Sequence, residues 1–217
     1  MKARFAYRCA AAAALAIAVG LSAGAAQAKD VVIHAGHLID GVSAKPLDKM
    51  SILIRDDRIT GVQKGFVTPA GAEVIDLSDA TVLPGLIESH DHISSVGDRR
   101  PLARFFDTEG DSVINAVVNA RTELGWGFTT VRDMGSGLYE GPALQRAIAA
   151  NKVVGPRLWT AMQPLGATGG HSDRNNGLRP GLDMPDSESG IVNGPESAAE
   201  QVRLHRRRGA NVIKLMP

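Results

Sequence analysis

Segments typical of β-strands and of α-helices alternate along the chain from Leu83 to Met216. Four segments have the apolar, β-branched composition of buried strands: TVLPGLIES, GFTTVRD, PRLWTA and ANVIKLM. This order of elements predicts right-handed crossovers and a parallel sheet covered on both faces. A doubly wound sheet and a (β/α)8 barrel both begin in this way, so the alternation favours an α/β fold without distinguishing the two.

Three helices are expected between these strands. The first rests on helical spacing of Ile114, Val117, Val118, Arg121 and Leu124, with Gly125 as the stop. The second is GPALQRAIAAN, with Pro142 in its first turn. A long loop rich in Gly and Pro, 162–195, precedes the third helix. Ser197 and Glu200 predict a capping box that opens this helix, and Gly209 closes it.

The region before the alternation has a different pattern. Short runs rich in Val and Ile, separated by Gly, Pro and Asp, predict a small β domain over residues 29–82. Asp56 and Asp57 lie between two such runs and predict a hairpin turn. Three or four short strands bury little apolar surface, so this layer is expected to pack against another part of the protein.

Residues 1–28 are typical of a secretory signal peptide. Lys2, Arg4 and Arg8 precede a short apolar stretch rich in Ala and Gly, and Ala26-Gln27-Ala28 fits a cleavage site. The apolar stretch is short for a membrane anchor, which needs about 20 apolar residues. We therefore expect export to the periplasm or the medium, with no membrane attachment after cleavage.

Composition excludes several kinds of partner and cofactor site. The formal net charge of +1 and the 4% aromatic content give no basis for nucleic-acid binding. The single cysteine, Cys9, lies in the expected signal peptide. The mature chain is therefore expected to have no disulfide, no thiolate metal ligand and no thiol nucleophile.

His90 and His92 directly follow the apolar run that begins at Leu83. Residues two apart on a strand point to the same side, so both imidazoles could bind one metal ion. They also fall at the carboxyl end of the strand, where α/β folds place their active sites. Two polar residues at the start of a loop are the alternative, but the preceding Pro84-Gly85 strand favours a metal site.

Lys214 lies within the apolar segment VIKLM. A buried, unpaired ammonium is costly, so the side chain must reach water, lose its charge or be modified. Carboxylation by CO2 would turn it into an anionic oxygen ligand. A lysine at the end of a strand, with its ammonium in water, is the alternative.

Other polar residues give weaker signals. His171 follows Gly169 and Gly170, which allow close backbone approach to a substrate, so His171 is a candidate substrate contact. Arg132 and Asp133 end the second strand and are expected to form a structural ion pair. The run from His205 to Arg208 is expected to be the solvated end of a helix.

The order of these motifs resembles the metal-dependent amidohydrolase superfamily. VLPGLIESHDHI is similar to its first-strand signature, usually P-G-L-I-D-x-H-x-H, and the preceding β region resembles the small sandwich beside its barrel. GFTTVRDMG, GGHSD and GANVIKLM resemble the imidazolonepropionase-like and Xaa-Pro dipeptidase-like branch. The resemblance implies a small β-sandwich-like layer followed by part of a (β/α)8 barrel of the TIM type.

The resemblance also implies a site and a reaction. His90 and His92 would bind the more buried of two Zn²⁺ ions, and carboxylated Lys214 would bridge both ions. His171 would contact the substrate. A metal-activated hydroxide would attack the carbonyl of an amide or dipeptide-like C–N bond. A small-molecule amide or peptide is therefore the expected partner, and the full-length parent enzyme could be an oligomer.

Two departures from the family pattern limit these expectations. Glu88 stands where the family has Asp. The chain ends at Pro217, and residues 83–217 cover about the first four of eight strands, without the later histidines and the aspartate of the family. We therefore expect a truncated amino-terminal half with little activity alone. A non-catalytic fragment or incomplete gene model and a mononuclear deaminase-type member are the alternatives.

Overall fold

The computed structural model describes residues 29–95, 106–183 and 190–216. The chain divides into two compact units, Met1–Leu83 and Pro84–Pro217. The expected signal peptide, residues 1–28, lies outside the described ranges. None of the helices in those ranges combines the length and the apolar character that crossing a bilayer requires.

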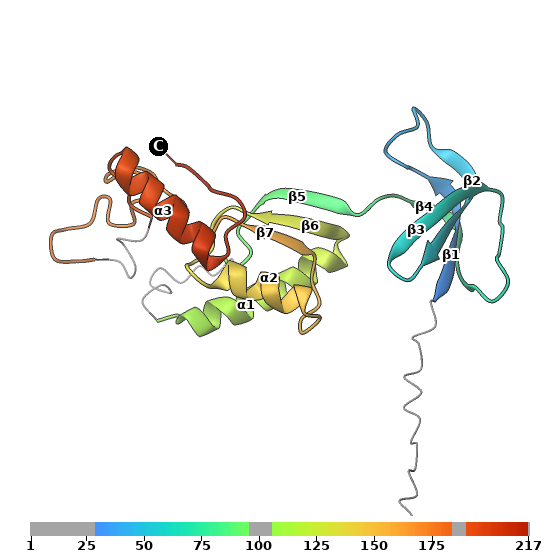
Figure 1. The fold of residues 1–217 in the computed structure, drawn as a ribbon, viewed down its shortest axis with the longest axis horizontal. Coiled ribbons are helices and arrows are strands. Elements are labelled where there is room, and N and C mark those ends of the chain that lie inside the picture. The colour runs from blue at the N-terminus through green and yellow to red at the C-terminus, as the bar shows by residue number, and fades with distance from the viewer. Residues whose placement is uncertain (1–28, 96–105, 184–189, 217) are drawn as a thin grey trace, which may run out of the picture. The chain divides into compact units, whose positions relative to one another are not determined.

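The first unit contains one four-stranded sheet. Its strands are β1 Asp30–Leu38, β2 Leu47–Arg55, β3 Arg58–Lys64 and β4 Glu73–Val82. They lie in the order β3-β2-β1-β4, with β1 and β2 antiparallel and β1 and β4 parallel (Figure 1). Ala35, Leu38, Met50 and Ile52 form its core. The described part of this unit therefore has one sheet, where the expected β-sandwich would have two.

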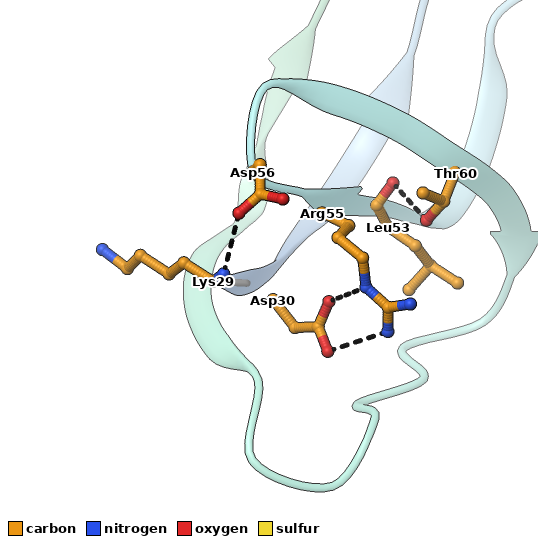
Figure 2. A network of polar contacts seen from close by, with 6 residues as sticks. All are labelled: Lys29, Asp30, Leu53, Arg55, Asp56 and Thr60. Atoms are coloured by element: carbon orange, nitrogen blue, oxygen red, sulfur yellow. Dashed lines mark hydrogen bonds and ion pairs between the residues drawn. The ribbon is translucent and has the colours of Figure 1, made fainter. Parts of the chain in front are cut away.

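Polar contacts fix the turn that joins β2 to β3. Arg55 donates two hydrogen bonds to the carboxylate of Asp30, at 2.8 and 3.1 Å (Figure 2). The Arg55 guanidinium lowers the pKa of Asp30. Asp56 adopts a φ of 56° and accepts a hydrogen bond from the backbone amide of Lys29 at 3.1 Å. The predicted Asp56-Asp57 turn is thus confirmed, and the start of β1 is tied to it.

The second unit alternates strands and helices as predicted. Its elements are β5 Leu86–Asp91, α1 Glu109–Gly125, β6 Phe128–Asp133, α2 Glu140–Ala149, β7 Arg157–Thr160 and α3 Pro195–Arg208. Strands β5, β6 and β7 form a parallel sheet in that order. Figure 1 shows α1 and α2 on one side of this sheet.

The core of the second unit lies between this sheet and its two covering helices. Ala116 and Ala120 of α1 pack with Leu144 of α2 against Val131 and Leu158 of the sheet. The small alanine side chains let α1 approach the strands closely. The sheet was expected to be buried on both faces, but this is wrong for β5, where Leu86 and Ile87 are 44% and 68% exposed.

Two details of the carboxyl-terminal part differ from the sequence predictions. ANVIKLM does not form a fourth strand; among the described residues it makes one isolated parallel bridge, between Leu165 and Leu215. The third helix starts at Pro195 with Gly194 as its N-cap, so the predicted capping box is wrong. Its first-turn Ser197 hydroxyl instead donates to the Gly194 carbonyl at 3.0 Å. Gly209 ends the helix with a φ of 116°, as predicted.

Gly85, which follows the proline of the first-strand motif, has no room for a side chain. A Cβ at this position would overlap the side chain of Thr129. We expect Gly85→Ala to lower the free energy of unfolding by about 1–3 kcal/mol, the usual cost of overpacking. Gly125→Ala is the matched control because a Cβ there meets nothing within 4 Å. Chemical denaturation would measure both, and equal effects would contradict the expected overlap.

His205 is buried, contrary to its expected place at a solvated helix end. Its side chain is 1% exposed, and its Nδ1 has no hydrogen-bond partner among the described residues. Burial, and secondarily the charge of Arg208, lowers the pKa of His205 below its ordinary value of 6.5. His205 is therefore held neutral in the folded protein near neutral pH.

This burial predicts a pH-dependent stability. In the unfolded chain His205 binds a proton below about pH 6.5, its ordinary pKa. In the folded chain it binds that proton only at a lower pH. The free energy of unfolding is therefore expected to fall as pH decreases through this window, by at most about 1.4 kcal/mol per pH unit. Urea titrations of the wild type and His205→Leu would measure it. An unchanged slope in the variant would rule out this role for His205.

Candidate metal centre

The carboxyl end of β5 carries the two predicted histidines. His90 lies within the strand, and His92 follows it directly. Their ring centroids are 5.6 Å apart. Because β5, β6 and β7 are parallel, the carboxyl ends of all three lie at the same edge of the sheet. This edge is where active sites of such folds lie.

Lys214 contacts His90 across a long stretch of chain. The Lys214 Nζ is 2.9 Å from the His90 Nε2, although 124 positions separate the residues. The Lys214 carbonyl accepts a hydrogen bond from Leu165 at 2.9 Å, and Met216 donates to the Leu165 carbonyl at 2.8 Å. Two backbone hydrogen bonds therefore hold Lys214 at the site even without a regular fourth strand.

The His92 imidazole is oriented by the backbone after β6. Its Nδ1 lies 2.8 Å from the carbonyl oxygen of Gly135. A Cβ on Gly135 would lie only 2.7 Å from the His92 ring, so this close approach requires glycine. Since a carbonyl only accepts, Nδ1 is the donor, and in the neutral imidazole Nε2 then keeps its lone pair. That tautomer is the one suited to binding a metal through Nε2.

Strand β5 carries two acidic residues close to His90 in sequence, Glu88 and Asp91. The Glu88 carboxylate accepts a hydrogen bond from the His90 amide at 2.8 Å. Burial, followed by the charges of Asp91 and Glu88, raises the pKa of Glu123. The Asp91 Oδ2 is buried and has no hydrogen-bond partner in the part of the chain that the structure describes. Glu88, which replaces the family's Asp, thus fixes the backbone of a candidate ligand.

His171 makes no hydrogen bond or ring contact with this cluster in the described residues. His171 has an exposed side chain in a turn where the Gly170 amide donates to the Ala167 carbonyl at 2.9 Å. Within residues 29–95, 106–183 and 190–216, no hydrogen bond or ring contact joins His171 to His90, His92 or Lys214. Its predicted contact with substrate stays a prediction.

The expected ion pair between Arg132 and Asp133 is absent from the described residues. Arg132 donates from Nε to the carbonyl of Ser89 at 2.6 Å, whereas Asp133 is fully buried. Burial raises the pKa of Asp133, and its hydrogen bonds act in the opposite direction. Sequence reasoning missed this buried carboxylate and the close approach of Gly135. The available signal for Asp133 was its place as a charged residue at the end of an apolar strand.

The donors at this edge fit part of a zinc site. His92 offers its Nε2, the His90 Nε2 contacts the Lys214 Nζ in this structure, and carboxylation of Lys214 would replace that contact with an oxygen donor. No group of three or more His, Cys, Asp or Glu side chains in the described ranges could hold a metal ion. A third donor from the described residues would therefore have to come from another residue type, and Lys214 is the residue in contact. Imidazole nitrogen and carboxylate oxygen are common zinc ligands.

Comparisons with known proteins agree with this arrangement of elements. Residues 81–216 match the amidohydrolase family. Ochratoxinase of Aspergillus niger is 29% identical over a match that covers 88% of this chain and 42% of the relative.

Several solved protein structures are similar to this chain in fold and in sequence. A Xaa-Pro dipeptidase with methionine bound in its active site is 37% identical, with a TM-score of 0.79. The match covers 86% of this chain and 47% of that chain. A prolidase complexed with N-methylphosphonate-L-proline is 27% identical, with a TM-score of 0.73 over 86% of this chain and 46% of that one. This chain thus spans less than half the length of each of these relatives.

Proposed function

Because the chain belongs to the amidohydrolase family, we propose that it supplies part of the active site of a metal-dependent hydrolase of amide or dipeptide-like C–N bonds. The contact between the Lys214 Nζ and the His90 Nε2, at 2.9 Å, carries this proposal. It joins a strand-end histidine to a lysine from a distant segment, at the edge of the sheet where parallel α/β folds bind substrates.

His90, His92 and Lys214 would hold the metal. The hydrogen bond from His92 Nδ1 to the Gly135 carbonyl leaves Nε2 free to bind. Carboxylation of Lys214 would remove its positive charge and the conflict with a nearby cation. When bound, a divalent metal supplies Lewis-acid chemistry, polarising a carbonyl and making water more acidic. Zinc takes about four donors, so these three residues leave room for a further ligand or a water molecule.

The same proposal covers the fold, the substrate class and the location. We propose that β5, β6 and β7 are the first strands of a (β/α)8 barrel, as the parallel order and the family suggest. The Xaa-Pro dipeptidase and prolidase among the similar structures support a dipeptide-like substrate. The sequence of residues 1–28 supports export through a cleaved signal peptide.

The test uses the natural protein, purified from its own host. We expect elemental analysis to find bound zinc, with one or two ions per chain distinguishing the mononuclear and binuclear alternatives. A chelator should abolish hydrolysis of Xaa-Pro dipeptides and N-acyl amino acids, and added zinc should restore it. Full hydrolysis by metal-free protein would contradict the proposal.

A further inference from the structure

A buried carboxylate connects the ends of all three strands in the second unit. Asp133, at the end of β6, is 0% exposed. Its Oδ1 accepts hydrogen bonds from the amides of Ile93 at 3.4 Å and Gly135 at 3.3 Å. Its Oδ2 accepts from the Thr160 hydroxyl, at the end of β7, at 2.8 Å. One carboxylate therefore binds donors that follow β5, follow β6 and end β7.

Two of these donors, the amides of Ile93 and Gly135, belong to residues that adjoin or contact His92. Ile93 is the next residue along the chain, so its amide fixes the backbone at His92. Gly135 donates its amide to Asp133 and accepts from His92 Nδ1 through its carbonyl. Asp133 thus holds both the backbone of His92 and the group that orients its ring.

The third donor leads towards Lys214. The Thr160 amide donates to the Asn211 side-chain oxygen at 2.8 Å, and the Asn211 amide donates to the Thr160 carbonyl at 3.1 Å. Asn211 lies three positions before Lys214. Thr160 therefore ties the carboxylate to the segment that places the lysine beside His90.

The surrounding space is shaped for these oxygens. A Cβ on Gly141 of α2 would overlap the hydroxyl oxygen of Thr160 and lie 2.9 Å from the Asp133 carboxylate. A buried carboxylate is costly unless hydrogen bonds satisfy it. The amides of Ile93 and Gly135 and the side chains of Thr160 and Ser136 meet that requirement here. An apolar residue could fill a purely structural position at lower cost.

We propose that Asp133 is a positioning residue that, with Thr160, holds His92 and the Lys214 segment in the arrangement needed to bind metal. It touches neither substrate nor metal and acts through Ile93, Gly135 and Asn211. This inference rests on the proposed function. It identifies Asp133 and Thr160 as residues that hold the candidate ligands in place.

Asp133→Asn tests the inference because it keeps the shape and removes the charge. The Asn amide would present a donor to a Thr160 hydroxyl that now lacks its acceptor. In the natural protein we expect zinc affinity to fall about 10-fold or more, as loss of a partner that orients a ligand commonly causes. Thr160→Val should weaken zinc binding in the same direction, and Thr160→Ser, which keeps the hydroxyl, should restore it.

The matched control is Gln145→Leu. Gln145 donates to the carbonyl of Leu158 on β7 at 2.6 Å, so its loss removes a partly buried polar contact from the same sheet without touching the strand ends. Its zinc affinity should equal that of the wild type. Equal weakening in Gln145→Leu and Asp133→Asn would mean a general loss of stability and would overturn the inference.

A second readout needs no metal. In chelator-treated natural protein, imidazole ¹⁵N spectra should show His92 with its hydrogen on Nδ1, and Asp133→Asn and Thr160→Val should each mix the two tautomers. Unchanged His92 signals in both variants would overturn the inference. If wild-type protein binds no zinc, the proposed function fails, and these spectra still decide whether Asp133 positions His92.

Discussion

His90→Ala is expected to remove most of the bound zinc and to reduce hydrolysis by the natural protein more than about 100-fold. Loss of a residue that only orients a ligand costs about 10–100-fold, so loss of a ligand should cost more. The His90 Nε2 is the atom that Lys214 contacts, so the substitution also removes the contact between the end of β5 and the Lys214 segment. Elemental analysis and initial rates on one protein sample would measure both effects.

The control for this substitution is His37→Ala. His37 lies in β1 of the first unit, is exposed, and its Nδ1 contacts the Asp48 carboxylate at 2.7 Å. Its replacement should leave zinc content and rate unchanged. A His90→Ala protein that keeps its zinc and its activity would show that the strand-end histidines are not metal ligands.

Lys214→Ala is expected to cause a loss of similar size, more than about 100-fold, because it removes the only ligand from its segment that the proposal assigns. Lys214→Arg should be equally inactive, since a guanidinium keeps its charge and cannot be carboxylated at neutral pH. Added propionate should restore part of the activity of Lys214→Ala, because its carboxylate can occupy the space of the missing carbamate.

Lys152→Ala is the control for the lysine. Lys152 is exposed between α2 and β7, so its loss should change neither activity nor the response to propionate. Full activity in Lys214→Arg would show that a cation is sufficient at this position. That outcome would remove the carboxylated lysine from the proposal while leaving the two histidines in place.

The strands and helices of the second unit were predictable because each has a strong local signal. Apolar runs gave β5, β6 and β7, and Gly209 marked the end of α3. The large apolar residues whose spacing predicted α1 are not the ones that it buries most deeply. Ile114 and Val118 are 64% and 58% exposed, while Ala116 and Ala120 are buried. Close packing on the sheet selected small side chains, which a pattern of large apolar residues does not reveal.

The candidate site was predictable only in part for a similar reason. His90 and His92 lie at the end of a strand with a clear pattern, so their place follows from local sequence. Lys214 was expected on a strand, but backbone bonds to Leu165 hold it without one. The roles of Asp133 and Gly135 depend on contacts between strand ends that are far apart in sequence.

The burial of His205 is a further case in which tertiary structure overrides local sequence. Its three neighbouring arginines, Arg206–Arg208, suggested a solvated helix end, and Arg206 and Arg207 are indeed exposed. The histidine occupies the opposite side of the last turn, where it is buried. Net charge along a segment therefore does not reveal which single residue faces the core.

A crystal structure of the natural protein grown with zinc, with anomalous data collected at the zinc edge, tests the proposed centre most directly. We expect zinc density bonded to the Nε2 atoms of His90 and His92, and an oxygen of carboxylated Lys214 on the same ion. An unmodified Lys214 still in contact with His90, with zinc absent or bound elsewhere, would contradict the proposed metal centre.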